Sequence, residues 1–119
     1  MATLAAIAVG LVAALHLYFL VLEMFLWKKP FGRRTFGLTR EMAEATASLA
    51  ANQGLYNGFL AAGLVWGLAL GAAGLALKVF FLVCVIVAGI FGAATANRKI
   101  LWVQAVPGAV ALALVLLAR

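Results

Sequence analysis

The sequence contains no aspartate, one histidine and one cysteine among its 119 residues. Cys84 lies within a long apolar run, so neither an intrachain disulfide nor a cysteine-based metal site can form. With a single histidine and no aspartate, the sequence also contains neither a Ser-His-Asp catalytic triad nor a histidine-rich metal-binding motif. We therefore expect no metal site and no cofactor.

Charge is also scarce. Only 10% of the residues are charged, 68% are hydrophobic, and the mean hydropathy is +1.20. A soluble domain is about a quarter charged and half apolar, so this composition excludes an ordinary water-soluble globule. The formal net charge of +6 comes from scattered basic residues that form no phosphate-tracking face, so we expect no nucleic-acid partner.

Apolar runs long enough to cross a membrane make up most of the chain. Each segment in hydrocarbon must satisfy its own backbone polar groups, which favours α-helices. We predict an all-α, polytopic membrane protein whose single domain, residues 1–119, is a four-helix transmembrane bundle in the lipid bilayer. The predicted spans are about 4–27, 53–73, 77–96 and 100–118, and residues 28–51 form a cytoplasmic connector.

The connector divides into two parts. Pro30, Gly32 and Gly37 favour irregular structure in its first half. Thr39 is a candidate N-cap for a helix with Glu41 in its first turn. This helix either lies at the membrane interface or extends the second span, and its modest apolar stripe consists of Met42, Ala45 and Leu49.

The basic residues predict the orientation. Seven of them fall in the first and third connectors and two on the opposite side, which by the positive-inside rule places both termini outside the cytoplasm. The seven are Lys28, Lys29, Arg33, Arg34, Arg40, Arg98 and Lys99, against Lys78 and Arg119. Trp27 and Trp102, at the cytoplasmic ends of two spans, indicate the same boundary.

Small residues recur at four-residue spacing along three of the spans. Such stripes let helix backbones approach closely, and we expect them to pack the bundle or, where two stripes share a helix, to form a homodimer seam. The stripes are Ala6–Gly10–Ala14, Gly54–Gly58–Ala62, Gly63–Gly67–Gly71 and Ala88–Gly92–Ala96.

Two ionisable residues lie inside the first span, where such groups are costly and indicate function by default. Glu23 is about one turn inside Trp27, and His16 lies on the same helix face about 10 Å deeper. They form a candidate acid–base pair. The structural alternatives are that Glu23 balances Lys28 or Lys29 and that His16 is a hydrogen-bonded neutral imidazole.

Other polar side chains gather at the same predicted cytoplasmic level. Because an unpaired amide in hydrocarbon costs several kcal/mol, this asymmetry predicts either a polar pocket open to the cytoplasm or inner leaflet, or a structural hydrogen-bond network. Pro107, one turn after Gln104, is expected to kink the last span beside it. The candidate ligand-binding residues are Asn52, Gln53, Tyr56, Asn57 and Gln104.

The segments His16–Trp27 (HLYFLVLEMFLW) and Asn52–Ala61 (NQGLYNGFLA) resemble a family of small bacterial membrane proteins known as domain of unknown function 1304. The resemblance extends from end to end and includes Phe36–Leu38, Ala88–Gly89, Gly92, Gln104 and Pro107. It implies a four-helix protein of the bacterial inner membrane with its polar motif residues grouped together, and it supplies no activity.

Three functional hypotheses follow. In the first, the polar pocket binds or processes a small amphipathic, lipid-like molecule, with Glu23 as proton donor or acceptor. In the second, Glu23 is the coupling carboxylate of a proton-coupled transporter, although it lies near the interface and not at the midplane where such sites tend to lie. In the third, the protein is a structural subunit of a membrane complex that uses its small-residue stripes. Whether it is an enzyme stays open.

Overall fold

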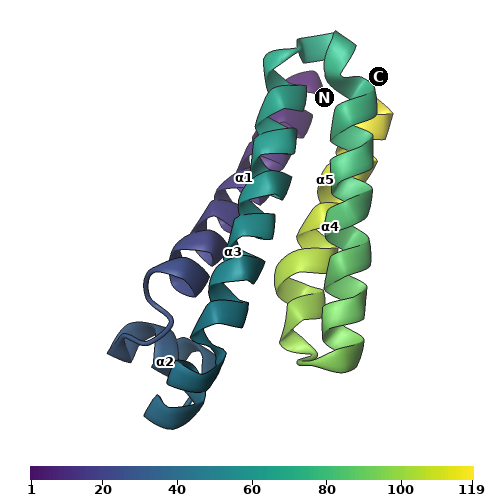
Figure 1. Cartoon of the computed structure of the whole chain (residues 1–119). Coiled ribbons are helices and arrows are strands. Elements are labelled where there is room, and N and C mark those ends of the chain that lie inside the picture. Colours follow the sequence, from purple (N-terminus) through teal and green to yellow (C-terminus); the bar gives the residue numbers. More distant parts are fainter. The chain divides into compact units, whose positions relative to one another are not determined.

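The computed structural model describes residues 1–119 and is built from helices alone (Figure 1). The all-α prediction is therefore confirmed. In chain order the elements are α1 (Ala2–Met24), α2 (Pro30–Phe36), α3 (Arg40–Ala69), the 3₁₀ turn η1 (Gly71–Gly74), α4 (Leu75–Thr95), the π-helical segment η2 (Leu101–Ala105) and α5 (Val106–Ala118).

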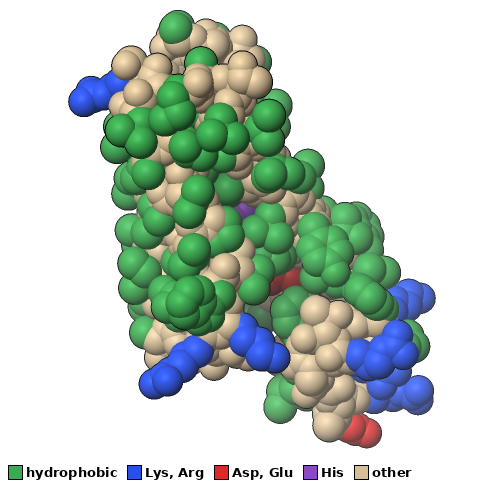
Figure 2. Space-filling view, turned by 180° about the vertical axis from the view of Figure 1, so that it is seen from behind, with side chains coloured by type: hydrophobic (Ala, Val, Ile, Leu, Met, Phe, Trp, Pro, Cys, Tyr) green, Lys and Arg blue, Asp and Glu red, His purple; other side chains and the backbone are tan.

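Three helical segments are long and apolar enough to cross a membrane: Ala2–Met24, Gly71–Thr95 and Leu101–Ala118. The second predicted span, 53–73, falls mainly in the second half of α3, which is not one of these three segments. Large apolar side chains are widely exposed, and they dominate the face seen in Figure 2. Such a surface is typical of a protein whose solvent is lipid.

The first half of the connector is helical, which corrects the prediction of irregular structure. Pro30 begins α2, where its fixed φ suits the first helical turn and its missing N–H leaves no intrahelical bond unmade. Gly37 ends α2 with a φ of 65°, a left-handed conformation open to glycine at little cost. The N–H groups of Gly37 and Leu38 then donate to the carbonyls of Arg34 and Arg33.

The second half of the connector belongs to α3, which runs unbroken for 30 residues. Of the two alternatives, the structure therefore shows one helix that continues into the predicted second span. Thr39 caps it as predicted, because its Oγ1 accepts a hydrogen bond from the Met42 N–H at 3.1 Å. Met42, Ala45 and Leu49 are exposed and do not pack inside the protein.

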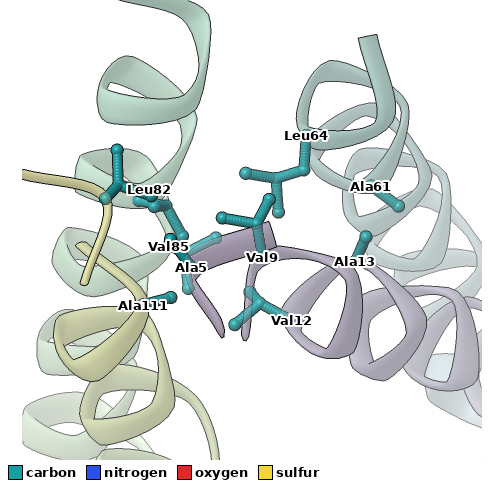
Figure 3. Close-up of a cluster of buried hydrophobic side chains, with 10 residues drawn as sticks. Ala5, Val9, Val12, Ala13, Ala61, Leu64, Leu82, Val85 and Ala111 are labelled. Atoms are coloured by element: carbon teal, nitrogen blue, oxygen red, sulfur yellow. The ribbon is translucent and has the colours of Figure 1, made fainter. Parts of the chain in front are cut away.

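The chain forms two compact units. The first comprises residues 1–14 and 60–119, and the second comprises residues 15–59. The core of the first unit is a cluster of side chains from α1, α3, α4 and α5 (Figure 3). Small residues alternate there with Leu and Val, and the members are Ala5, Val9, Val12, Ala13, Ala61, Leu64, Leu82, Val85, Ala111 and Val115.

Glycines set the helix contacts of the first unit. A Cβ on Gly63 would collide with the Phe81 ring, and one on Gly74 would collide with the Gly67 carbonyl. Gly63 and Gly67 therefore face neighbouring segments of this unit, whereas a Cβ on Gly71, the third residue of the predicted stripe, would meet nothing within 4 Å. A Cβ added to Gly10 of α1 would meet no neighbouring atom within 4 Å. The homodimer seam expected on the second predicted span, which carries two stripes, stays a prediction.

Pro107 follows a wide π turn. In this segment the Val106 N–H donates to the carbonyl of Leu101, five residues earlier. Pro107 then lies in the first turn of α5, where its missing N–H is tolerated. The structure thus shows a change of helical register beside Gln104, and the kink stays a prediction.

We expect Gly89→Ala to lower the free energy of unfolding by about 1–3 kcal/mol, because its new Cβ would lie 2.8 Å from the backbone nitrogen of Ala105. The control Gly10→Ala adds a methyl group to open space and removes a helix glycine, so it should be neutral or stabilising by up to about 1 kcal/mol. Thermal unfolding in detergent measures both. Equal melting temperatures for the two variants would contradict this account of the α4–η2 contact.

Candidate functional site

The second unit contains the end of α1, all of α2 and the first part of α3. Within it, α3 approaches α1 through glycines. A Cβ on Gly54 would lie 2.7 Å from Met24 Cγ and 3.2 Å from Glu23 Cβ, and one on Gly58 would lie 2.8 Å from Leu20 Cδ1. At Gly54 the added Cβ would also lie 3.3 Å from the Leu20 carbonyl oxygen, so the two helices approach closely here.

This approach brings Glu23 to Asn57. The Asn57 side-chain amide donates a hydrogen bond of 2.5 Å to Glu23 Oε1. Asn57 is only 6% exposed, and Glu23 is half-buried. Since Gly54, Asn57 and Gly58 are spaced i, i+3, i+4, one face of α3 supplies both the close approach and the donor.

A cavity of about 190 Å³ opens beside this hydrogen bond. Glu23 is in its wall together with the two lysines that follow α1, and neither lysine forms an ion pair with the carboxylate. The interpretation in which Glu23 simply balances Lys28 or Lys29 therefore lacks the expected contact. The lining residues are Glu23, Met24, Phe25, Trp27, Lys28, Lys29 and Ala47.

Trp27 fixes one wall of this cavity. Its indole Nε1–H donates to Thr46 Oγ1 at 3.0 Å, and the Thr46 hydroxyl donates to the Met42 carbonyl at 2.7 Å. The Trp27 ring also lies against Phe36 of α2, with ring centroids 4.7 Å apart. Trp27 thus joins the turn after α1 to both α2 and α3, beyond its predicted role as a boundary marker.

His16 is fully buried. Its imidazole meets the ring of Phe19 edge-on, with centroids 5.3 Å apart. It lies seven residues before Glu23, which corresponds to about 10 Å along α1. The two residues thus share a face of α1, and their pairing as acid and base stays a prediction.

The remaining predicted site residues are differently placed. Asn52, Gln53 and Tyr56 are exposed. Gln104 is half-buried in the first unit, where its Nε2 donates to the Val85 carbonyl of α4 at 3.1 Å. The structure therefore brings Glu23 and Asn57 together, gives Gln104 a helix-to-helix hydrogen bond, and leaves three residues on the surface.

The contributions of Thr46 and Ala47 to this site were not predicted. Ala47 lines the cavity, and Thr46 holds Trp27 in its wall. A signal was present, because small residues recur at three- and four-residue spacing along the first half of α3. Ala43 and Ala50 on that face are buried, and Ala47 is half-buried. The packed face of this half of α3 is thus indicated by small residues and not by large apolar ones.

We expect Glu23→Leu to lower the free energy of unfolding by about 1–3 kcal/mol, because it leaves the buried Asn57 amide without its acceptor. Glu23→Gln keeps an acceptor oxygen and should cost less. The double variant Glu23→Leu/Asn57→Leu should recover part of the loss, since both polar partners are then removed. A double-mutant cycle from thermal unfolding measures this coupling, and strictly additive effects would contradict it.

Fold and composition together define an all-α protein with three helices suited to cross a membrane. The chain belongs to the family described as "Protein of unknown function (DUF1304)", which matches residues 10–116. It is also similar to the uncharacterized protein YpaA of Lactococcus lactis subsp. lactis (strain IL1403). The identity is 30% over 105 residues, covering 86% of this chain and 88% of that protein. No solved structure matches the chain.

Proposed function

We propose that the protein crosses the bacterial inner membrane four times, with the second half of α3 as the second of the four spans and both termini outside the cytoplasm. The distribution of seven basic residues against two supports this orientation. The length of α3 supports the span, because 30 helical residues extend about 45 Å and a hydrocarbon core is about 30 Å thick. The polar first half of α3 would then lie outside the hydrocarbon.

We further propose that the cavity beside Glu23 binds the polar head of a small amphipathic, lipid-like molecule. The observation that carries this proposal is a carboxylate held by a buried amide in the wall of a cavity that two lysines also line. Lys28 and Lys29 attract an anionic part of the ligand, while Glu23 accepts hydrogen bonds from its hydroxyl or amine groups.

The size of the cavity limits what enters it. Whole-ligand pockets commonly measure about 300–1,000 Å³, and this cavity measures about 190 Å³. A head group fits, and its apolar tail remains in the surrounding lipid. Phe25 is 64% exposed in the cavity wall and offers the tail an apolar contact.

Asn57 gives the site its directionality. An amide that donates to Oε1 holds the Glu23 carboxylate in one orientation, so its remaining acceptor positions keep a fixed direction. This arrangement supports binding of a ligand that carries hydrogen-bond donors. Acid–base chemistry by Glu23 would use the same fixed carboxylate, with His16 as the second titrating group in the predicted pair.

The test is the set of lipids that copurifies with the protein. After mild detergent extraction, mass spectrometry of the bound lipids should identify an enriched amphipathic species in the unmodified protein. In Glu23→Gln its occupancy should fall by about tenfold, because a charge-assisted hydrogen bond contributes about 1.5–3 kcal/mol.

Glu44→Gln is the matched control. It removes the same charge from an exposed position of α3 outside the cavity, so occupancy should stay at the level of the unmodified protein. Identical lipid profiles and occupancies in all three proteins would overturn the proposed function.

A further inference from the structure

A second and larger cavity lies in the first unit, beside the turn that joins α3 to α4. Its volume is about 520 Å³, within the range common for ligand pockets. The walls are mostly small or apolar, among them Ala6 of α1, Leu75 of α4 and Val115 of α5. Lys78 and Arg119 also line it, and it shares no lining residue with the cavity beside Glu23.

Lys78 is held in the wall of this cavity. Its ammonium group donates a hydrogen bond of 3.3 Å to the Gly71 carbonyl. Its aliphatic stem crosses Gly67, where an added Cβ would lie 2.7 Å from Lys78 Cγ. The glycine of α3 therefore provides the space through which the lysine stem reaches the cavity.

The ammonium group of Lys78 has hydrogen-bond donors left over for a ligand. Lys78 lies in the first turn of α4, at the end of the apolar segment Gly71–Thr95, where a lysine can extend its ammonium group to the membrane interface. The Gly71 carbonyl satisfies one of its three donors, and an ammonium group has no acceptor of its own. An apolar cavity bordered by two cations is complementary to an apolar chain that ends in an anion.

We propose that this cavity binds an anionic phospholipid from the adjacent leaflet. One acyl chain occupies the apolar wall, and the phosphate lies at Lys78 and Arg119. This site is distinct from the one at Glu23, because the two cavities have no lining residue in common. An acyl chain that fills the cavity would stabilise the turn Gly71–Gly74 by covering its apolar side.

The experiment is a lipid titration of the full-length protein followed by native mass spectrometry. Phosphatidylglycerol and phosphatidylcholine with the same acyl chains are the two probes. We expect the unmodified protein to prefer phosphatidylglycerol by about fivefold, as estimated for one basic residue near an anionic lipid. In Lys78→Met this preference should fall, because only Arg119 is then left to attract the anionic head group.

Lys99→Met is the matched control, because Lys99 is exposed and does not line the cavity. It should keep the fivefold preference. A Lys78→Met protein with the same preference as the unmodified protein would overturn the proposal.

A second variant tests the acyl part independently of charge. Ala6→Leu fills the cavity from an exposed position of α1, so it should weaken binding of both lipids while the protein still folds. Glycerol 3-phosphate, which carries the phosphate without an acyl chain, should bind neither protein measurably. Unchanged lipid binding by Ala6→Leu, or tight binding of glycerol 3-phosphate, would show that no acyl chain occupies the cavity.

Discussion

Close backbone contact at glycine is the constraint on which the structure depends. In lipid, apolar side chains gain little from leaving one solvent for another like it, so helix association relies on packing and on a few hydrogen bonds. Gly54 and Gly58 bring α3 onto α1, Gly63 and Gly67 receive side chains of α4, and Gly89 lies against Ala105. The hydrogen bond from Asn57 to Glu23 forms beside Gly54 and Gly58, and the one from Gln104 to Val85 forms beside Gly89.

The few polar side chains in the apolar segments have two different roles. Gln104 reaches a backbone carbonyl on α4 and so ties two helices together. Glu23 reaches a side-chain amide instead, and it does so at the wall of a cavity. A hydrogen bond to a neighbouring backbone can be purely structural, whereas a carboxylate beside open space retains acceptor capacity for a ligand. This difference separates the candidate site from the structural contacts.

Composition and periodicity predicted the helical class and the Thr39 cap, because these features depend on local chemistry. The face that packs in the first half of α3 was not predicted, since Met42, Ala45 and Leu49 form its visible apolar stripe and are exposed. The buried positions there are held by alanines, whose small side chains allow close approach and give only a weak periodic signal. The hydrogen bond between Glu23 and Asn57 could not be predicted from local sequence patterns, because it joins residues 34 positions apart.

The π-helical segment Leu101–Ala105 has a consequence for the evolution of the last helix. A π-helical turn is closed by a hydrogen bond between residues five apart, so it contains one residue more than an α-helical turn. The residues after it are therefore shifted by one position relative to a regular α-helix. Gly108, Ala111 and Val115 are buried in the resulting phase. Deletion of one residue within the segment would restore regular α-helical pairing and keep the same residues inward. A length difference of one residue is thus a change that this helix can absorb without repacking its core.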